Sequence, residues 1–437
     1  MIRSKLLLLF IAFQAIAVSV SAQSGYIKVN KQQFVLNNKP YYYVGANYWY
    51  GGLLALQKNP KRGTDRIRKE LDFLKSRGVT NLRVLVGAEG KGQINGVQRV
   101  APALQPDRGQ FNVQLLESLD YLLYEMGKRN MYAVLYLSNN WEWSGGFLQY
   151  LNWSKQLDAT KMKSKMSWDD IRDITAKFYT CQPCLDDYDK QLTFILNHKN
   201  KYTRRSYTNE PAIMAWELAN EPRPMRPYAT ADYKNWIQST AKRIRSIDKN
   251  HLITLGSEGV MGTESMELFK EIHAVKEVDY LTLHIWPKNW SWFRDTSITD
   301  SLPRVIARSI EYINQHESIA KELQKPLVIE EFGLPRDNHS FDPATTTSSR
   351  DQYFASVFAK WLRSKNTSGG IGGVCFWAFG GTSRPIKNQL FWKPGDDFSG
   401  DPPQEEQGLN TVFDSDNSTW KVIRSFTQPS NTITLSK

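Results

Sequence analysis

The chain has 437 residues, of which 41% are hydrophobic and 23% are charged, and its formal net charge is +12. This composition excludes a disordered or fibrous protein, and the length allows one large domain. Aromatic residues make up 12% of the chain, with 14 tryptophans, 20 tyrosines and 20 phenylalanines. So many flat rings in a basic chain indicate a protein that stacks on its ligand, with sugar rings favoured and nucleic-acid bases as the alternative.

The amino-terminal residues have the pattern of a secretory signal peptide. Arg3 and Lys5 precede an apolar segment over residues 6–20, and small residues follow at 21–22. The segment is too short for a membrane span, and no later segment approaches the roughly 20 apolar residues that a span needs. We therefore expect a signal peptide over residues 1–22 and a secreted or periplasmic domain over residues 23–437, with no membrane attachment after signal removal.

Short apolar segments rich in β-branched and aromatic residues recur along the chain after this point. Most have apolar residues at consecutive positions, as do strands that are covered on both faces. Eight strands are predicted, over Tyr42–Asn47, Asn81–Val86, Tyr132–Leu137, Ile213–Ala219, Leu252–Leu255, Tyr280–Ile285, Leu327–Glu331 and Gly373–Phe379.

Segments of helical periodicity lie between these strands. Helices are predicted over Thr64–Ser76, Phe111–Lys128, Tyr233–Ile247 and Pro303–Gln315, the last with its proline in the first turn, and a final helix is predicted around Ser418–Ser425. Gln33–Tyr42, with an Asn-Asn turn, predicts a hairpin that covers the bottom of the fold. Eight strands alternating with helices predict an α/β protein with a single (β/α)8 TIM barrel, an N-terminal hairpin and a short C-terminal extension.

The three cysteines do not form a disulfide scaffold. Cys181 and Cys184 are spaced Cys-x-x-Cys, which we interpret as a local disulfide or two inert thiols, and Cys375 lies in an apolar run and is expected to be buried. Neither a second ligand pair for zinc nor a thioredoxin-like context is visible. We therefore expect no metal and no cofactor. The positive charge is dispersed and accompanies no nucleic-acid motif, so we expect no nucleic-acid partner.

The strand ends carry the candidate chemistry, because active sites of such barrels lie at the carboxyl-terminal ends of the strands. The fourth strand ends in Asn220-Glu221, where a carboxylate at the rim favours a general acid, whereas Glu217 lies deeper and favours a paired structural carboxylate. The seventh strand ends in Glu330-Glu331. Successive strand side chains face opposite sides, so only one of these two can point at the centre, and the sequence leaves open which one.

Carboxylates from the fourth and seventh strands enter one barrel mouth from opposite sides, which is the geometry of glycoside hydrolysis. Arg83 on the second strand can hold the nucleophile ionised or form a salt bridge inside the barrel. Polar and aromatic residues at three further strand ends favour sugar binding: Asn139, Asn140, Trp141, Trp143, His284, Trp286 and Trp377.

These residues resemble glycoside hydrolase family 5 over nearly the whole mature chain. The most specific parts are Trp-Glu-Leu-Ala-Asn-Glu-Pro at 216–222 and Glu-Glu-Phe-Gly at 330–333. Within the family, Asn-Asn-Trp-Glu-Trp-Ser-Gly-Gly at 139–146 and His-Ile-Trp-Pro-Lys-Asn-Trp at 284–290 resemble the β-mannanases. The resemblance implies a retaining endo-β-1,4-mannosidase acting on mannan, galactomannan or glucomannan, and we expect it to be a monomer.

The resemblance also implies residue roles. Glu221 matches the acid/base, Glu331 the nucleophile and Asn220 the amide at the sugar 2-hydroxyl. Arg83 and His284 match the polar shell of the nucleophile, and Trp377 matches the floor of the subsite for the reacting sugar. Retention implies carboxyl groups about 5–5.5 Å apart.

This chain also departs from the wider family pattern. Many members have Tyr where this chain has Trp286, so a hydroxyl contact to the nucleophile is expected to be missing. Where many members place His after the third strand, this chain has Asn139 or Asn140. An exo-β-mannosidase, a β-1,4-glucanase and a catalytically dead carbohydrate-binding barrel stay open as alternatives.

Overall fold

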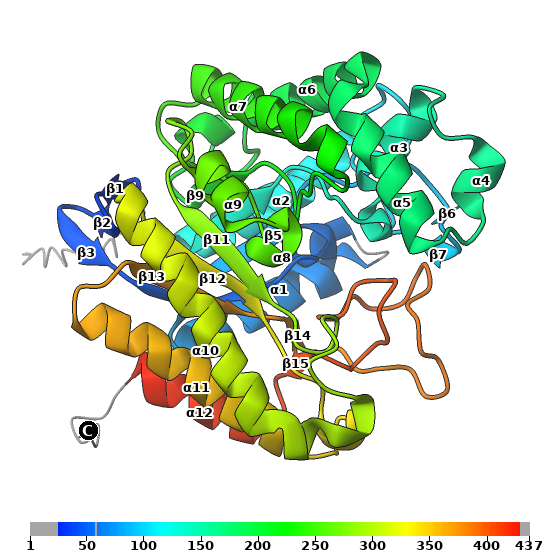
Figure 1. Cartoon of the computed structure of the whole chain (residues 1–437). Coiled ribbons are helices and arrows are strands. Elements are labelled where there is room, and N and C mark those ends of the chain that lie inside the picture. Colours follow the sequence, from blue (N-terminus) through cyan, green and yellow to red (C-terminus); the bar gives the residue numbers. More distant parts are fainter. Residues whose placement is uncertain (1–24, 57–58, 429–437) are drawn as a thin grey trace, which may run out of the picture.

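Eight parallel strands form the centre of the computed structural model, which describes residues 25–56 and 59–428 (Figure 1). Around the barrel they follow the order β10-β9-β8-β5-β4-β13-β12-β11. Their bounds are β4 Tyr43–Asn47, β5 Val79–Leu85, β8 Tyr132–Tyr136, β9 Ile213–Glu217, β10 Leu252–Thr254, β11 Leu281–Ile285, β12 Leu327–Phe332 and β13 Ile371–Phe376. Each of the eight predicted strands overlaps one of these, which confirms the barrel.

The barrel closes between β10 and β11 through fewer backbone hydrogen bonds than elsewhere. The Asp279 N–H donates to the Ile253 carbonyl at 2.8 Å, and the His284 N–H donates to the Glu258 carbonyl at 3.2 Å. Nearly every residue of the eight strands is buried, because helices cover the outside and packed side chains fill the inside. The consecutive apolar residues seen in the sequence follow from this two-sided burial.

Helices surround the barrel and connect its strands (Figure 1). Their bounds are α1 Pro60–Ser76, α2 Val113–Lys128, α3 Gly146–Trp153, α4 Ala159–Lys163, α5 Trp168–Thr175, α6 Gln182–Leu196, α7 Thr230–Ile247, α8 Val260–Thr263, α9 Met266–His273, α10 Ile298–Leu323, α11 Ser348–Asn366 and α12 Asn417–Thr427. The predicted helices correspond to α1, α2, α7, α10 and α12. Short 3-10 helices lie at Gly51–Leu56, Glu142–Ser144, Ala176–Thr180, Tyr207–Asn209, Pro227–Ala229, Asp295–Ser297 and Asp337–His339.

Helix α10 corrects one predicted boundary. It begins at Ile298, so Pro303 lies inside the helix and not in its first turn. The preceding turn is retained because Ile298 and Leu302 are buried against the core. Pro303 is the sixth residue of the helix, so it removes one backbone hydrogen bond just beyond the first turn, whose N–H groups have no partner within the helix.

A small antiparallel sheet covers the amino-terminal end of the barrel, as predicted. It contains β1 Lys28–Asn30, β2 Gln33–Leu36 and β3 Lys39–Tyr41. Asn37 and Asn38 both have positive φ, of 51° and 61°, as a two-residue hairpin turn requires. The Phe34 ring packs edge-on against Tyr280 with centroids 5.2 Å apart, which closes the barrel from below.

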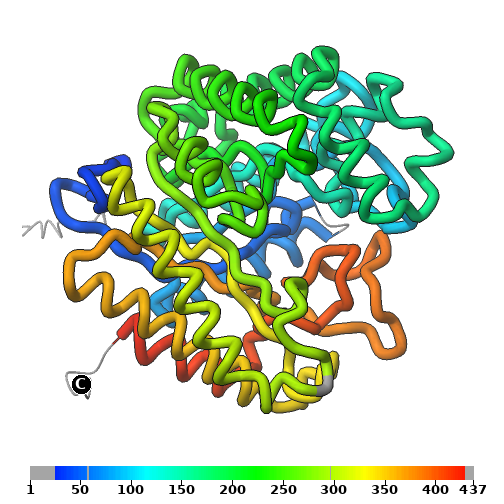
Figure 2. The backbone as a smooth tube through the Cα atoms, viewed as in Figure 1, coloured from blue at the N-terminus to red at the C-terminus, as the bar shows by residue number. Residues whose placement is uncertain are grey.

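Two irregular segments lie together near the opposite end. One contains the hairpin of β6 Gln93–Ile94 and β7 Val97–Gln98, and the other runs through residues 382–411 between β14 Phe379–Gly381 and β15 Val412–Phe413. Figure 2 shows the second segment as an orange-to-red tube beside the cyan hairpin, and residues of both line one groove. These segments extend the wall of the barrel mouth.

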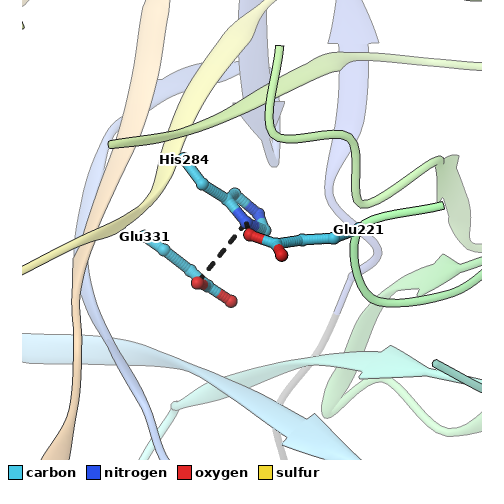
Figure 3. Close-up of side chains that lie close together, drawn as sticks. All are labelled: Glu221, His284 and Glu331. Carbon is cyan, nitrogen blue, oxygen red and sulfur yellow. Dashed lines mark hydrogen bonds and ion pairs between the residues drawn. The ribbon is translucent and has the colours of Figure 1, made fainter. Parts of the chain in front are cut away.

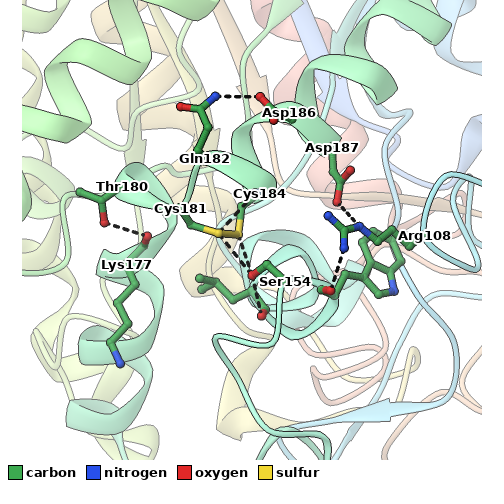
Figure 4. Close-up of a disulfide and its surroundings, with 11 residues drawn as sticks. Arg108, Ser154, Lys177, Thr180, Cys181, Gln182, Cys184, Asp186 and Asp187 are labelled. Atoms are coloured by element: carbon green, nitrogen blue, oxygen red, sulfur yellow. Dashed lines mark hydrogen bonds and ion pairs between the residues drawn. A yellow bond between two sulfur atoms is a disulfide. The ribbon is translucent and has the colours of Figure 1, made fainter.

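Cys181 and Cys184 form a disulfide at the amino-terminal end of α6 (Figure 4). The Ser154 hydroxyl, directly after α3, lies 3.3 Å from the Cys181 sulfur and 3.1 Å from the Cys184 sulfur. Cys375 is free and buried, as predicted. The bond therefore joins neighbouring residues at a helix start and packs against the end of α3.

The predicted signal peptide, residues 1–22, lies outside the described residues. Within the described part of the chain, no helix combines the length and the apolar character needed to cross a membrane.

Candidate active site

The carboxyl-terminal ends of the barrel strands open into a cavity of about 510 Å³. Of the residues predicted for the site, seven line it: Trp141, Trp143, Asn220, Glu221, Trp286, Glu331 and Trp377. Arg83 and His284 lie beneath the lining and contact its carboxylates. The cavity is therefore where the barrel rule places an active site.

Glu221 and Glu331 face one another across His284 (Figure 3). One carboxylate oxygen of each and one ring nitrogen of His284 all lie within 4.8 Å of one another. Glu331 lines the cavity, whereas its neighbour Glu330 does not and instead contacts His284 Nε2 at 3.3 Å. The alternation of strand side chains therefore points Glu331 at the cavity and Glu330 into the layer behind it.

Donors surround Glu331. The buried Arg83 guanidinium donates to one carboxylate oxygen, and Trp286 Nε1 donates to the other at 2.9 Å. A hydroxyl contact to the nucleophile was expected to be missing, because this chain has Trp286 where many family members have tyrosine. The Trp286 indole N–H makes a hydrogen bond to Glu331 in its place. A charge-assisted bond and a second donor both stabilise the ionised form of Glu331.

Arg83 also connects Glu331 to the barrel wall, so both roles considered for it are present. It donates to the two carboxylate oxygens of Glu217 at 2.8 and 2.5 Å and to the Asn220 side-chain oxygen at 2.7 Å. Asn220 in turn donates to Asn139 at 3.1 Å. Glu217 is fully buried and paired, as predicted for a structural carboxylate, and Asn139 fixes the orientation of the Asn220 amide.

Glu221 lies four residues after the end of β9 and has an unusual backbone conformation. Its φ of +49° lies in the left-handed region, which costs a residue other than glycine about 1–3 kcal/mol. The Glu221 N–H donates to the Gly256 carbonyl at 2.9 Å, His284 Nδ1 lies 2.7 Å from its carboxylate, and Trp141 Nε1 donates to the other oxygen. Three contacts therefore hold the strained residue with its carboxylate facing the cavity.

The acidic and basic groups of the cavity shift one another's pKa values. Burial opposes protonation of His284, but the Glu331 charge and hydrogen bonds with Glu221 and Glu330 raise the pKa of His284 to about 10. Burial opposes ionisation of Glu221, but the His284 contact lowers its pKa. Burial, together with the Glu221 charge, raises the pKa of Glu331 despite His284 and Arg83. In the free protein, the shared proton therefore rests on His284.

Glu221, His284 and Glu331 are also the only described His, Cys, Asp and Glu residues grouped closely enough to surround a metal ion. Both ring nitrogens of His284 already face carboxylates of the protein, Nδ1 at 2.7 Å from Glu221 and Nε2 at 3.3 Å from Glu330. The chemistry of this donor set is therefore that of proton transfer and charge stabilisation.

Two of the other predicted tryptophans line the cavity and pack against neighbouring rings. Trp377 lies edge-on to Trp286 with ring centroids 5.6 Å apart, and Trp143 packs against Trp49 at 5.4 Å. Asn140 does not line the cavity: its side chain is buried with neither amide atom hydrogen-bonded. Asn139 does not line the cavity either, but it accepts a hydrogen bond from the cavity residue Asn220. A substrate contact of Asn139 or Asn140 stays a prediction.

Several cavity residues were missed by sequence reasoning. Arg223 follows the Asn-Glu-Pro motif, and Glu258 follows the fifth strand, so both stood at positions where strand-end reasoning could have found them. Trp168 opens α5, outside any strand end. Gln404 and Glu405 come from the long segment 382–411, whose sequence has no periodicity that would place it over the barrel.

Known proteins share this fold and sequence. A family model described as GH family 5 beta-mannosidase-like matches residues 24–434. Mannan endo-1,4-beta-mannosidase 7 of Arabidopsis thaliana is 29% identical over 396 residues, covering 85% of this chain and 84% of that protein. The family 5 mannosidase of Rhizomucor miehei is 28% identical with a TM-score of 0.83, covering 92% of this chain and 97% of that chain.

A more distant structure has the same architecture. The endo-beta-1,4-mannanase of Thermotoga petrophila is 22% identical with a TM-score of 0.64, covering 90% of this chain and 77% of that chain, and at this identity the likeness concerns the fold. The match of the family model over all described residues agrees with the barrel and its paired glutamates. This chain belongs to glycoside hydrolase family 5, among its β-mannosidase-like members.

Proposed function

We propose that this chain is a retaining glycoside hydrolase that cleaves β-1,4-mannosidic bonds within mannan-type polysaccharides. The observation that carries the proposal is the pair Glu221 and Glu331, whose nearest oxygens lie within 4.8 Å in one cavity. Retaining enzymes place their carboxyl groups about 5–5.5 Å apart, whereas inverting enzymes leave room for a water between them.

The surroundings of the two glutamates support different roles for them. Glu331, with Arg83 and Trp286 as donors, is the nucleophile that attacks the anomeric carbon and forms a glycosyl-enzyme ester. Glu221 protonates the departing oxygen and later removes a proton from the attacking water. Asn220, oriented by Arg83 and Asn139, is placed to contact the sugar 2-hydroxyl.

The resting protonation state requires a proton to reach Glu221 before the bond breaks. His284 Nδ1 lies 2.7 Å from Glu221 and 3.4 Å from Glu331. We infer that His284 passes its proton to Glu221 when substrate binds, so that Glu221 enters the first step protonated and Glu331 enters it ionised. The sum of protons on the three groups is unchanged by this transfer.

Mannan as the substrate is supported by the relatives. The curated relatives at 28–29% identity are named as mannan endo-1,4-beta-mannosidases, and a variant of the Rhizomucor mannosidase was solved with mannosyl-fructose. The signal-peptide pattern supports action outside the cytoplasm, on a polysaccharide too large to enter a cell. We propose that the chain works as a monomer, with its cavity built entirely from its own residues.

A second candidate is an exo-acting β-mannosidase. Gln404 and Glu405, from the segment 382–411, line the cavity, and one Glu405 carboxylate oxygen is buried without a hydrogen-bond partner. A carboxylate in this place can bind the hydroxyls of a terminal sugar and limit the length of the cavity.

Product analysis tests both candidates. Wild type and the variants Glu221→Gln and Glu331→Gln are incubated with mannan, galactomannan, cellulose and a series of manno-oligosaccharides. Endo action releases mixed oligosaccharides early, exo action releases mannose alone, and activity on cellulose without activity on mannan would overturn the substrate. Each variant should lose at least about 100-fold in activity.

Glu142→Gln is the matched control for these variants. Glu142 lies in the same barrel mouth but bonds Asn95 and does not line the cavity. Its substitution should leave activity near that of the wild type. Full activity in Glu331→Gln would contradict its proposed role as the nucleophile.

A further inference from the structure

We propose that Trp168, together with Trp141 and Arg223, forms a ledge that binds the sugars on the leaving-group side of the scissile bond. The inference rests on the proposed function, because it assigns a substrate-binding role to this rim of the same cavity. Trp168 lines the cavity and yet leaves 47% of its surface exposed. A large exposed ring beside a catalytic cavity indicates a ligand that covers it.

The three side chains form one continuous surface. The Arg223 guanidinium lies 5.0 Å from the centre of the Trp141 ring and 6.0 Å from the Trp168 ring. The two tryptophan rings are 6.1 Å apart and inclined by only 32°. Trp141 also donates its indole N–H to Glu221. The ledge therefore begins at the proposed acid and continues outward through Arg223 to Trp168.

Arg223 is fixed from behind by a buried carboxylate. Glu258 accepts from Arg223 Nε at 2.6 Å and pairs with a terminal guanidinium nitrogen at 2.5 Å. Burial raises the pKa of Glu258 to about 7, although the Arg223 charge opposes this rise. This ion pair holds the guanidinium beside both rings, where it can also donate to sugar hydroxyls.

Helix α5, which carries Trp168 as its first residue, is tied to the loop directly after Glu221. Arg226 pairs with Asp169 at 2.9 Å and with Asp173 at 2.7 Å, and Arg172 donates to the Met225 carbonyl at 2.8 Å. A capping box between Ser167 and Asp170 fixes the helix start. The exposed ring is therefore held at a set distance from the acid, as a binding platform requires.

The contacts of the two carboxylates indicate on which side of the scissile bond the ledge lies. Trp286 bonds Glu331 and packs against Trp377, whereas Trp141 bonds Glu221 and neighbours Trp168. An acid that protonates the leaving oxygen has the leaving sugar on its own side. Trp141 is thus expected to contact the first leaving-group sugar, and Trp168 a sugar further along the chain.

Kinetics over substrate length tests the ledge. In Trp168→Ala, kcat/KM for manno-oligosaccharides that extend past Trp141 should fall about 10-fold or more, as expected when the apolar surface that the sugar covers is lost. An aryl β-mannoside, whose leaving group is too short to reach Trp168, should be hydrolysed at the wild-type rate. Trp168→Phe should recover most of the loss because it restores a ring.

Tyr202→Ala is the control, because Tyr202 is 44% exposed and does not line the cavity. Tyr202→Ala should change kcat/KM for neither the manno-oligosaccharides nor the aryl β-mannoside. Equal losses on short and long substrates, or no loss on long ones, would overturn the ledge while the wild type still hydrolyses mannosides. A wild type inactive on all mannosides would instead overturn the proposed function. If Trp168→Ala does not fold, Trp168→Gln gives the same readout.

Discussion

The carboxylate of Glu331 has two donors of different kinds, the Arg83 guanidinium and the Trp286 indole. The guanidinium supplies charge, and the indole supplies a neutral N–H from the cavity wall. Glu221 has the complementary arrangement, with His284 as the group that exchanges a proton with it and Trp141 as the neutral donor. Two glutamates of one chemical type thus acquire two different environments.

Trp286→Phe tests the indole contact. The ring and its packing against Trp377 are kept, but the hydrogen bond to Glu331 is lost. A hydrogen bond to a charged group contributes about 1.5–3 kcal/mol, so kcat/KM should fall by about 10- to 100-fold. Steady-state kinetics on a manno-oligosaccharide measures the effect.

Trp290→Phe provides the comparison, because Trp290 lines the same cavity without a hydrogen bond to either glutamate. Its rate constants should stay close to those of the wild type. An equal loss in both variants would show that ring size, and not the Trp286 N–H, matters.

Strands β5 and β9 are joined inside the barrel by a buried ion pair. Arg83 and Glu217 are each almost fully buried, and the guanidinium reaches both carboxylate oxygens. This pair fixes the arginine that contacts Glu331, so the wall of the barrel positions the site. Glu217 is a positioning residue, since it acts through Arg83.

Glu217→Ala should destabilise the fold, because the buried Arg83 guanidinium loses two of its hydrogen bonds and keeps only its contacts with the cavity side of the barrel. The expected decrease in the free energy of unfolding is about 3–5 kcal/mol, since each hydrogen bond to a charged group contributes about 1.5–3 kcal/mol. Chemical denaturation measures it, with Glu117→Ala as the control, since the exposed Glu117–Lys201 pair contributes at most about 1 kcal/mol. Similar losses in both variants would contradict the structural role of Glu217.

The elements that sequence could predict are those under a simple periodic rule. The eight strands are buried on both faces, and α1, α2 and α7 have one apolar face, so each leaves a recognisable pattern. Glu221 and Glu331 followed from strand ends and the resemblance. Segment 382–411, which brings Glu405 to the cavity, has no such pattern because tertiary contacts alone determine its course.

The same limit explains the residues that were left open or missed. Strand alternation alone left the choice between Glu330 and Glu331 open, and the resemblance indicated Glu331, which lines the cavity. Placing the side chains of Asn139 and Asn140 would have required knowing the course of the loop after the third barrel strand. Finding Trp168 would have required knowing that α5 packs against the loop after Glu221, which is a contact between segments far apart in sequence.

The whole molecule is expected to lose stability in alkali through His284. Its pKa in the folded state is about 10, above the ordinary 6.5, because Glu331, Glu221 and Glu330 outweigh the opposing effect of burial. The folded state therefore holds a proton that the unfolded state releases earlier. This stabilisation is complete below about pH 6.5 and is lost as the pH rises toward 10.

Thermal unfolding of wild type and His284→Gln across pH 6.5 to 10 measures this linkage. The window between pH 8 and 10 is the most informative, because Glu258 and Glu217 titrate at or below its lower limit, with pKa values of about 7 and 8. The wild-type Tm should fall more steeply than that of the variant. Parallel curves would show that His284 does not carry the proton.

The central claim is that Glu221 and Glu331 cleave a β-mannosidic bond with retention of configuration. Proton NMR of the first product, recorded before the sugar mutarotates, measures this directly on the wild-type protein with a manno-oligosaccharide. Two successive displacements at one carbon predict that the new reducing end appears first as the β-anomer and drifts to the α-anomer later. Initial release of the α-anomer would contradict the account, because it would require a water between the two carboxylates and no bond to Glu331.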